Sequence, residues 1–243
     1  MIQTVISLFF WSLGLVHFAV LAGIAIPLLL VLPARRIFPL ARWLCRNQLR
    51  FMGCRLEVLG LENVPKDRAC LLLGNHESLF DVFAVGGTLP RFAVGLEADS
   101  HFKIPLWGRI TRTWGQLSLP EGRMAEARET FEQAAEVLAS GTDVIILPEG
   151  HRTRTGALGA LKKGAFHLAL ATKADILPFV QQGLYEFHNT HSWRLFPRRL
   201  RVIFGKPIPF ESFKDLSVEE LRERVRQVLL ELDKSWEAGK LGR

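Results

Sequence analysis

The sequence predicts an α/β domain, in which helices cover a mixed or mainly parallel sheet, joined to an N-terminal membrane-embedded helical segment. Three observations support this prediction. The chain has 243 residues, which is enough for one domain with a large buried core. Every Lys, Arg, Asp and Glu lies after position 34. Beyond that point, short apolar runs typical of buried strands alternate with amphipathic stretches typical of helices.

The first element is an apolar segment over residues 5–32, long enough as a helix to cross a hydrocarbon core of about 30 Å. No positive side chain precedes it and residues 27–32 are bulky, so we do not expect a cleaved signal peptide. Gly14, Gly23 and Pro27 are possible break points, which leaves open either one tilted span or a helical hairpin inserted into one leaflet. We expect His17 to be a satisfied or interfacial side chain and not a functional group.

A basic stretch follows the apolar segment. Its arginines are Arg35, Arg36, Arg42, Arg46 and Arg50, and the first acid is Glu57. This bias predicts a cytoplasmic membrane location, with the following domain on the cytoplasmic face. We therefore expect a membrane-anchoring segment over residues 1–34, a basic amphipathic juxtamembrane segment over residues 35–54 and the α/β domain over residues 55–243.

Apolar periodicity predicts the elements of the domain in order. Stripes at helical spacing predict five helices, at residues 38–51, 77–85, 124–138, 164–172 and 218–236. Short apolar runs predict seven strands, at residues 56–58, 70–73, 92–95, 116–119, 144–147, 176–180 and 199–204. Because ligands collect beyond the C-terminal ends of parallel strands, His76 and Glu149, each just past a strand, are candidate site residues.

The overall charge leaves several partners open. A net charge of +7 is compatible with nucleic acid, an anionic membrane surface or an anionic small substrate. The sequence contains no recognised nucleic-acid motif, so we expect no nucleic-acid partner. Its three cysteines have no metal-ligand spacing, so we expect reduced thiols and no metal site.

The first motif with chemical potential is Asn75-His76-Glu77-Ser78-Leu79-Phe80-Asp81. With His76 in the turn after a strand and Asp81 in the first turns of a helix, the carboxylate can bend back toward the imidazole. It could then fix the tautomer and stabilise the imidazolium that forms when His76 accepts a proton. The alternative interpretation is that Asp81, Glu77 or Ser78 caps the helix.

The second motif is Leu147-Pro148-Glu149-Gly150-His151-Arg152-Thr153-Arg154, followed by Lys162 and Lys163. A strand end, a conformationally permissive Gly150 and several basic side chains suit a phosphate or another anion. Arg152 is able to bind such a group in bidentate fashion. A solvated basic loop is the alternative interpretation.

Together, these two blocks, the run that begins at Leu161-Lys162-Lys163-Gly164 and Ile176-Leu177-Pro178 resemble the glycerolipid acyltransferase family. Within it, the sequence is most similar to the lysophosphatidic acid (1-acyl-sn-glycerol-3-phosphate) acyltransferases. The similarity covers about residues 55–210. Two positions depart from the family pattern, since His151 replaces a common Thr and Arg123 ends a middle block two residues late. These departures concern the acceptor headgroup more than the reaction.

The resemblance implies that His76 is the general base, that Asp81 orients it, and that Glu149, Gly150 and Arg152 belong to the substrate-binding block. The implied partners are a lysolipid acceptor, an acyl-CoA or acyl-carrier protein donor, and the membrane. The implied product is phosphatidic acid. Because the thioester is already activated, no cofactor is expected. An acyltransferase for another lysolipid and a non-catalytic lipid-binding protein are the alternatives.

Overall fold

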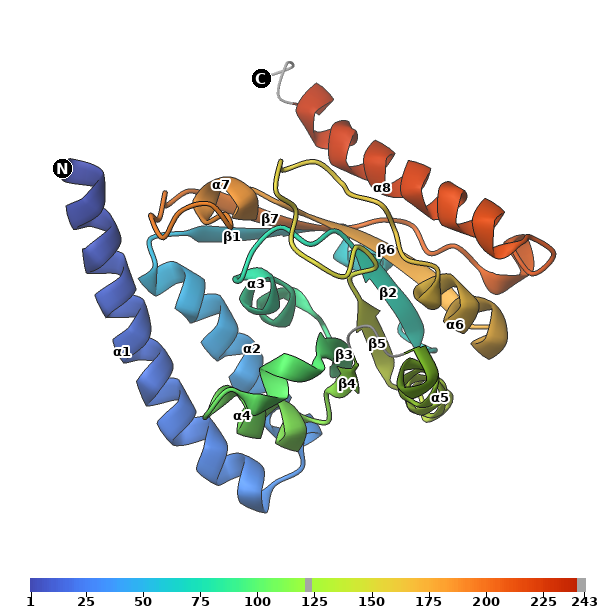
Figure 1. Ribbon diagram of the computed structural model, residues 1–243, viewed down its shortest axis with the longest axis horizontal. Helices are drawn as coiled ribbons and strands as arrows, with labels where there is room; N and C mark the ends of the chain where they lie inside the picture. The colour runs from blue at the N-terminus through green and yellow to red at the C-terminus, as the bar shows by residue number, and fades with distance from the viewer. Residues whose placement is uncertain (121–123, 240–243) are drawn as a thin grey trace.

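The computed structural model describes residues 1–120 and 124–239, and these form a sheet with helices on both faces (Figure 1). The α-helices are α1 Ile2–Val31, α2 Ala34–Phe51, α3 Asp81–Thr88, α4 Trp107–Trp114, α5 Met124–Ala139, α6 Gly164–Thr172, α7 Leu184–Phe187 and α8 Val218–Gly239. The strands are β1 Arg55–Leu59, β2 Cys70–Gly74, β3 Ala93–Ala98, β4 Leu117–Leu119, β5 Asp143–Ile146, β6 Asp175–Gln182 and β7 Arg199–Phe204.

The sheet is mainly parallel, as the sequence predicts. Its seven strands have the order β1-β7-β6-β2-β5-β3-β4, and only the β6–β7 pair is antiparallel. β2 and β5 are parallel neighbours, with Leu73 opposite Ile146. The loops that follow these two strands therefore leave the sheet at the same edge.

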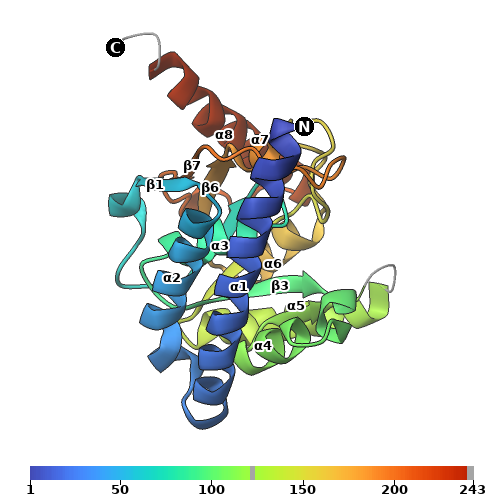
Figure 2. The ribbon, with the colours of Figure 1, turned by 90° about the vertical axis from the view of Figure 1, so that its left-hand side faces the viewer.

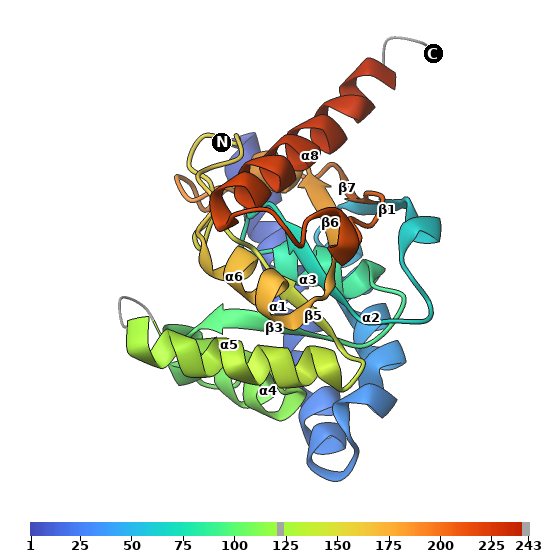
Figure 3. The same cartoon turned by 90° about the vertical axis from the view of Figure 1, so that its right-hand side faces the viewer.

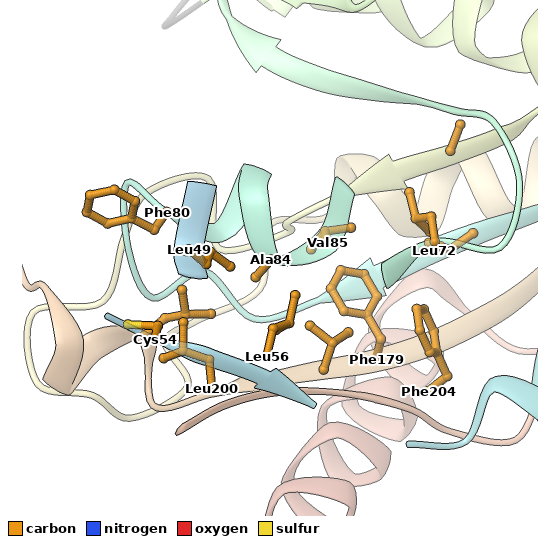
Figure 4. Packing of buried hydrophobic residues seen from close by; sticks show 14 of the residues in the cluster. Leu49, Cys54, Leu56, Leu72, Phe80, Ala84, Val85, Phe179, Leu200 and Phe204 are labelled. Atoms are coloured by element: carbon orange, nitrogen blue, oxygen red, sulfur yellow. The ribbon is translucent and has the colours of Figure 1, made fainter. Parts of the chain in front are cut away.

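Alternation along β2 explains how the sheet holds a layer on each face. Cys70 and Leu72 belong to one buried apolar cluster, whereas Leu71 and Leu73 belong to the other, since successive side chains of a strand point to opposite faces. The first cluster contains residues of α2 and α3 and is seen from close by in Figure 4. The second contains residues of α5, α6 and α8, which lie on the opposite face (Figure 3).

The N-terminal segment forms a helical hairpin, with α1 and α2 side by side (Figure 2). Gln48 of α2 is buried between them, and its Nε2 donates to the Gly14 carbonyl at 3.0 Å. Its Oε1 lies 2.7 Å from His17 Nδ1. His17 is therefore a satisfied side chain that joins the two helices, as its sequence context suggests.

A polar stripe fixes the first half of α1 on the domain. Gln3 and Ser7 hydrogen-bond the backbone of Leu195, and Trp11 Nε1 donates to the Trp193 carbonyl at 2.8 Å. Spacings of four residues place these three side chains on one helix face. These hydrogen bonds hold the first half of α1 against the domain.

The surface of α1 that faces away from the domain and from α2 is apolar and uncovered. Of the described helices, α1 is the one long and apolar enough to cross a membrane, and 22% of its most apolar window is buried. Its exposed large apolar residues are Ile2, Val5, Leu8, Phe9, Leu15, Val16, Val20, Ile24, Leu30 and Val31.

Two sequence predictions need correction. The helix expected at residues 77–85 begins at Asp81 because residues 76–80 form a loop around the Asp81 carboxylate. The helices α4 and α7, at Trp107–Trp114 and Leu184–Phe187, are additional to those expected. The other strands and helices lie close to their predicted ranges.

Candidate active site

His76 and Asp81 form a hydrogen-bonded pair at the C-terminal edge of the sheet. His76 lies two residues beyond the end of β2, and Asp81 is the first residue of α3. The distance from His76 Nδ1 to Asp81 Oδ2 is 2.6 Å. The two side chains are 25% and 3% exposed, so the carboxylate is buried while an edge of the imidazole remains accessible.

The Asp81 carboxylate also holds the loop that carries His76. It accepts from the backbone N–H of Glu77 at 2.8 Å and from that of Ser78 at 2.9 Å. Burial raises the pKa of the Asp81 carboxyl, while the His76 imidazole and the two amides oppose this shift by donating to the ionised form. Because an ionised carboxylate only accepts hydrogen bonds, Nδ1 carries the proton in neutral His76 and Nε2 presents its lone pair.

Glu149, from the loop after β5, is linked to the backbone of the same histidine. It is 3% exposed, and its carboxylate accepts from His76 N at 2.8 Å and from Gly159 N at 2.7 Å. Burial raises the pKa of the Glu149 carboxyl, and both amides oppose the shift. Both carboxylate oxygens are bound by backbone N–H groups, so Glu149 connects the loop after β5 to the backbone of His76.

The same loop binds the other side of the His76 peptide. Thr153 N donates to the His76 carbonyl at 2.8 Å. Gly150 turns the chain between these contacts with a φ of +72°, a conformation that glycine adopts without steric cost. The Lys162 side chain crosses the face of Gly150 where a Cβ would lie.

Arg152 lies between the two contacts of this loop with His76. The guanidinium is partly exposed and makes no hydrogen bond or ion pair with any residue described in the structure. An arginine without a protein partner has its five N–H donors available for an anion. The loop therefore brings a cationic side chain to the edge at which the imidazole lies.

Asn75 and Glu77 attach the His76 loop to β6 and α7, which the sequence motif does not reveal. Asn75 Oδ1 accepts from Gln181 N at 2.7 Å, and Asn75 Nδ2 donates to Gln181 O at 2.9 Å. The Glu77 carboxylate accepts from the backbone N–H groups of Leu184 and Tyr185, both at 3.0 Å. Burial and the charge of Asp81 raise the pKa of Glu77 well above its usual range. Both residues adjoin His76 in sequence, but their partners lie more than 100 positions away.

His188 is a second imidazole beside this loop that the sequence does not single out. Its carbonyl accepts from Ser78 Oγ at 2.7 Å. Of the remaining sequence candidates, Arg123 lies outside the described residues, and His151 is exposed. Within the described ranges, no group of three His, Cys, Asp or Glu side chains could hold a metal ion.

Sequence comparisons place these residues in a known context. The family model described as Acyltransferase matches residues 55–182, a range that includes His76, Asp81, Glu149 and Arg152. The 1-acyl-sn-glycerol-3-phosphate acyltransferase alpha of Ovis aries is 27% identical over 179 residues, which are 73% of this chain and 62% of the sheep protein. The 1-acyl-sn-glycerol-3-phosphate acyltransferase of Pseudomonas aeruginosa is 25% identical over 203 residues, 80% of this chain and 77% of that protein.

Several of these relatives are longer proteins, and this chain covers less than two thirds of their length. The fold is similar to that in the crystal structure of the 1-acyl-sn-glycerophosphate (LPA) acyltransferase from Thermotoga maritima. The TM-score is 0.82 at 23% sequence identity, over 99% of this chain and 97% of the other. The family model covers more than half of the chain and includes both halves of the site described above. The chain therefore belongs to the acyltransferase family.

Proposed function

We propose that this protein is an O-acyltransferase that converts 1-acyl-sn-glycerol 3-phosphate to phosphatidic acid. The acyl chain comes from acyl-CoA or acyl-carrier protein and is transferred to the sn-2 hydroxyl. The observation that carries the proposal is the contact of 2.6 Å between His76 Nδ1 and buried Asp81, which leaves Nε2 available as a base. Names of relatives such as the Pseudomonas aeruginosa enzyme support the choice of acceptor.

In this mechanism, His76 Nε2 removes the proton from the acceptor hydroxyl as its oxygen attacks the thioester carbonyl carbon. The C–O bond forms, and the carbonyl electrons move to the oxygen of a tetrahedral intermediate. When that intermediate collapses, the C–S bond breaks and the imidazolium returns its proton to the thiolate. Asp81 stabilises the imidazolium throughout, since its negative charge lies against Nδ1.

The loop after β5 has two roles in this proposal. Arg152 binds the acceptor phosphate, because its guanidinium is positive and has no protein partner among the described residues. Glu149 acts as a positioning residue through the His76 amide, and Gly150 provides the turn between them. Of the three residues predicted to bind substrate, Arg152 thus contacts the substrate, whereas Glu149 and Gly150 hold the loop in its conformation.

The test is acyl transfer by purified protein with a panel of lysolipids and both thioester donors. We expect transfer to 1-acyl-sn-glycerol 3-phosphate, and we expect the His76→Ala variant to lose about 10²-fold or more in kcat. His167→Ala is the matched control because it removes an exposed imidazole on α6. A His76→Ala variant with the wild-type rate would exclude the mechanism, and transfer to a different lysolipid alone would exclude the acceptor.

We further propose that the α1–α2 hairpin enters one leaflet on the cytoplasmic face and does not span the bilayer. The polar stripe of Gln3, Ser7 and Trp11 holds the start of α1 on the domain. The opposite surface of α1 is apolar and uncovered, which suits acyl chains. Arg36 and Arg50 of α2 are exposed and therefore available for anionic headgroups. The lysolipid then binds from, and the product returns to, the same leaflet that the hairpin enters.

Membrane sidedness distinguishes this arrangement from a spanning helix. With an epitope tag before Met1, the hairpin predicts that the tag and the domain are digested by protease from the same side of sealed membrane vesicles. A spanning α1 places the tag on the opposite side, so protection of the tag while the domain is digested would refute the hairpin.

A further inference from the structure

His188 directly follows α7 and contacts residues from two other parts of the chain. Its ring makes edge contacts with Trp11 of α1, at a centroid distance of 5.7 Å, and with Phe80 of the His76 loop, at 5.4 Å. Its carbonyl accepts from Ser78 Oγ at 2.7 Å. The backbone of His188 is therefore tied directly to the loop that carries the base.

The imidazole has an unsatisfied nitrogen. His188 Nδ1 is buried and has no hydrogen-bond partner among the residues that the structure describes. Buried polar atoms nearly always have a partner, so this exception beside the candidate site requires an explanation, and a ligand bound there would supply one. The ring can meet such a ligand by turning about χ2, which is a soft torsion.

The loop that carries Arg152 is closed onto the same segment. The carbonyl of Arg154 accepts from Tyr185 Oη at 3.0 Å and from His191 Nε2 at 2.8 Å. Burial first and the Arg152 charge second lower the pKa of the His188 imidazole. The unpartnered His188 nitrogen thus belongs to the segment on which the Arg152 loop closes, and Arg152 has no anionic protein partner in the described residues.

Other charges near His188 are already engaged. The described residues of α1 carry no charged side chain. In the His76 loop, the Glu77 carboxylate accepts two backbone N–H groups and Asp81 is bound to His76. On the His188 segment itself, Glu186 is exposed and pairs with Arg198 at 3.5 Å. An anion that binds at Arg152 would therefore be the new negative charge that His188 meets.

We propose that Arg152 and His188 together bind the phosphate of the acceptor and that His188 takes up a proton when the phosphate binds. This inference rests on the proposed function for the identity of the acceptor. A phosphate monoester carries about −1.5 to −2 charges at pH 7, which cancels the repulsion from Arg152 and supplies an acceptor for the imidazolium. His188 is then a specificity-determining residue that distinguishes a phosphate headgroup from an uncharged one.

The test is equilibrium binding, which needs no donor and no turnover. Binding of 1-acyl-sn-glycerol 3-phosphate to the full chain in detergent micelles is measured by calorimetry at pH 7, in two buffers with different ionisation enthalpies. We expect wild-type protein to take up a proton on binding and His188→Gln to take up none. The affinity of that variant should fall at least about tenfold, which is about 1.4 kcal/mol. His167→Gln, on the exposed face of α6, is the control and should bind as the wild type does.

A phosphate-free monoacylglycerol separates the phosphate contact from a general packing effect. Its affinity should be the same for wild type and His188→Gln. Binding of the phosphate lipid without proton uptake, or equal uptake by His188→Gln, would overturn the inference. An equal loss of affinity for both lipids would do so as well. A wild-type protein that binds the phosphate lipid with proton uptake but transfers no acyl chain would instead overturn the proposed function.

Discussion

Replacing Asp81 by Asn tests the role of its charge without changing its size. The Asp81 carboxylate accepts three N–H groups, from the His76 imidazole and the amides of Glu77 and Ser78. An Asn side chain has one acceptor oxygen and one donor group. If its amide donates to Nδ1, the His76 proton moves to Nε2 and blocks the base. If its oxygen accepts from Nδ1, the tautomer is kept but the imidazolium loses its counter-charge.

The size of the effect follows from the geometry. With Nδ1 and Oδ2 at 2.6 Å, the centres of the two charged groups are about 4 Å apart, which gives about 4 kcal/mol at an effective dielectric constant of 20. Because about 1.4 kcal/mol is a factor of ten in rate, kcat should fall about 10³-fold. This value lies within the range of about 10² to 10⁴ that general-base catalysis contributes. The KM for the acceptor should change little, since Asp81 is buried behind the imidazole.

The assay is steady-state acyl transfer at several pH values, with the folded fraction of each variant measured in parallel. Asp143→Asn is the matched control. Asp143 is also buried, at 1% exposure, and it accepts from Cys70 N and from Arg91, but at the start of β5. It should lose stability and keep its kcat per folded molecule. A kcat for Asp81→Asn within about threefold of wild type, or an equal loss in the control, would refute the role assigned to the charge.

Three further substitutions address the support of the site and the helical hairpin. Glu149→Gln should lower kcat with little change in KM in steady-state assays, because one of its two backbone donors then faces an amide N–H; an effect confined to KM would contradict this. Gln48→Leu should destabilise the helical hairpin by about 1–3 kcal/mol, since the His17 imidazole and the Gly14 carbonyl lose their partner. Thermal unfolding in detergent measures this as about 2–4 °C per kcal/mol, and an unchanged midpoint would contradict it. Because the Glu77 pKa is raised in the fold, its contribution to stability is present below about pH 4.3 and is lost as pH rises toward the folded pKa. The free energy of unfolding in urea of Glu77→Gln, relative to that of the wild type, should therefore be higher at pH 7 than at pH 5. A difference that does not depend on pH would contradict the shift.

The sequence predicted the layers of the fold because each layer has a local signal. The continuous apolar run of β2 and the period-3.6 stripe of α8 are decided by burial, which a single chain segment records. The antiparallel direction of β7 has no such signal, because it depends on which strands pair across the sheet. The start of α3 was misplaced because Asp81 bonds backward to the amides of residues 77 and 78, and those residues also suit a helix.

The candidate site was also predictable in part. The spacing of His76 and Asp81 indicated a contact, and the structure places them at 2.6 Å. Its supporting contacts were not predictable, because Asn75 bonds to Gln181 across 106 positions and Glu77 to the amide of Leu184 across 107. His188 was not predictable for the same reason, since nothing in the sequence around it links it to Arg152.

The two loops that meet at His76 also limit how this protein can change. The N–H of His76 is bound by Glu149 and its carbonyl by Thr153, so the peptides on both sides of this residue are bonded to the loop after β5. A residue inserted or deleted between Glu149 and Thr153 would break one contact or move the imidazole. Surface loops usually tolerate insertions and deletions. Here the two connections must keep matched lengths, so engineering of the acceptor side should replace residues in this loop and leave its length unchanged.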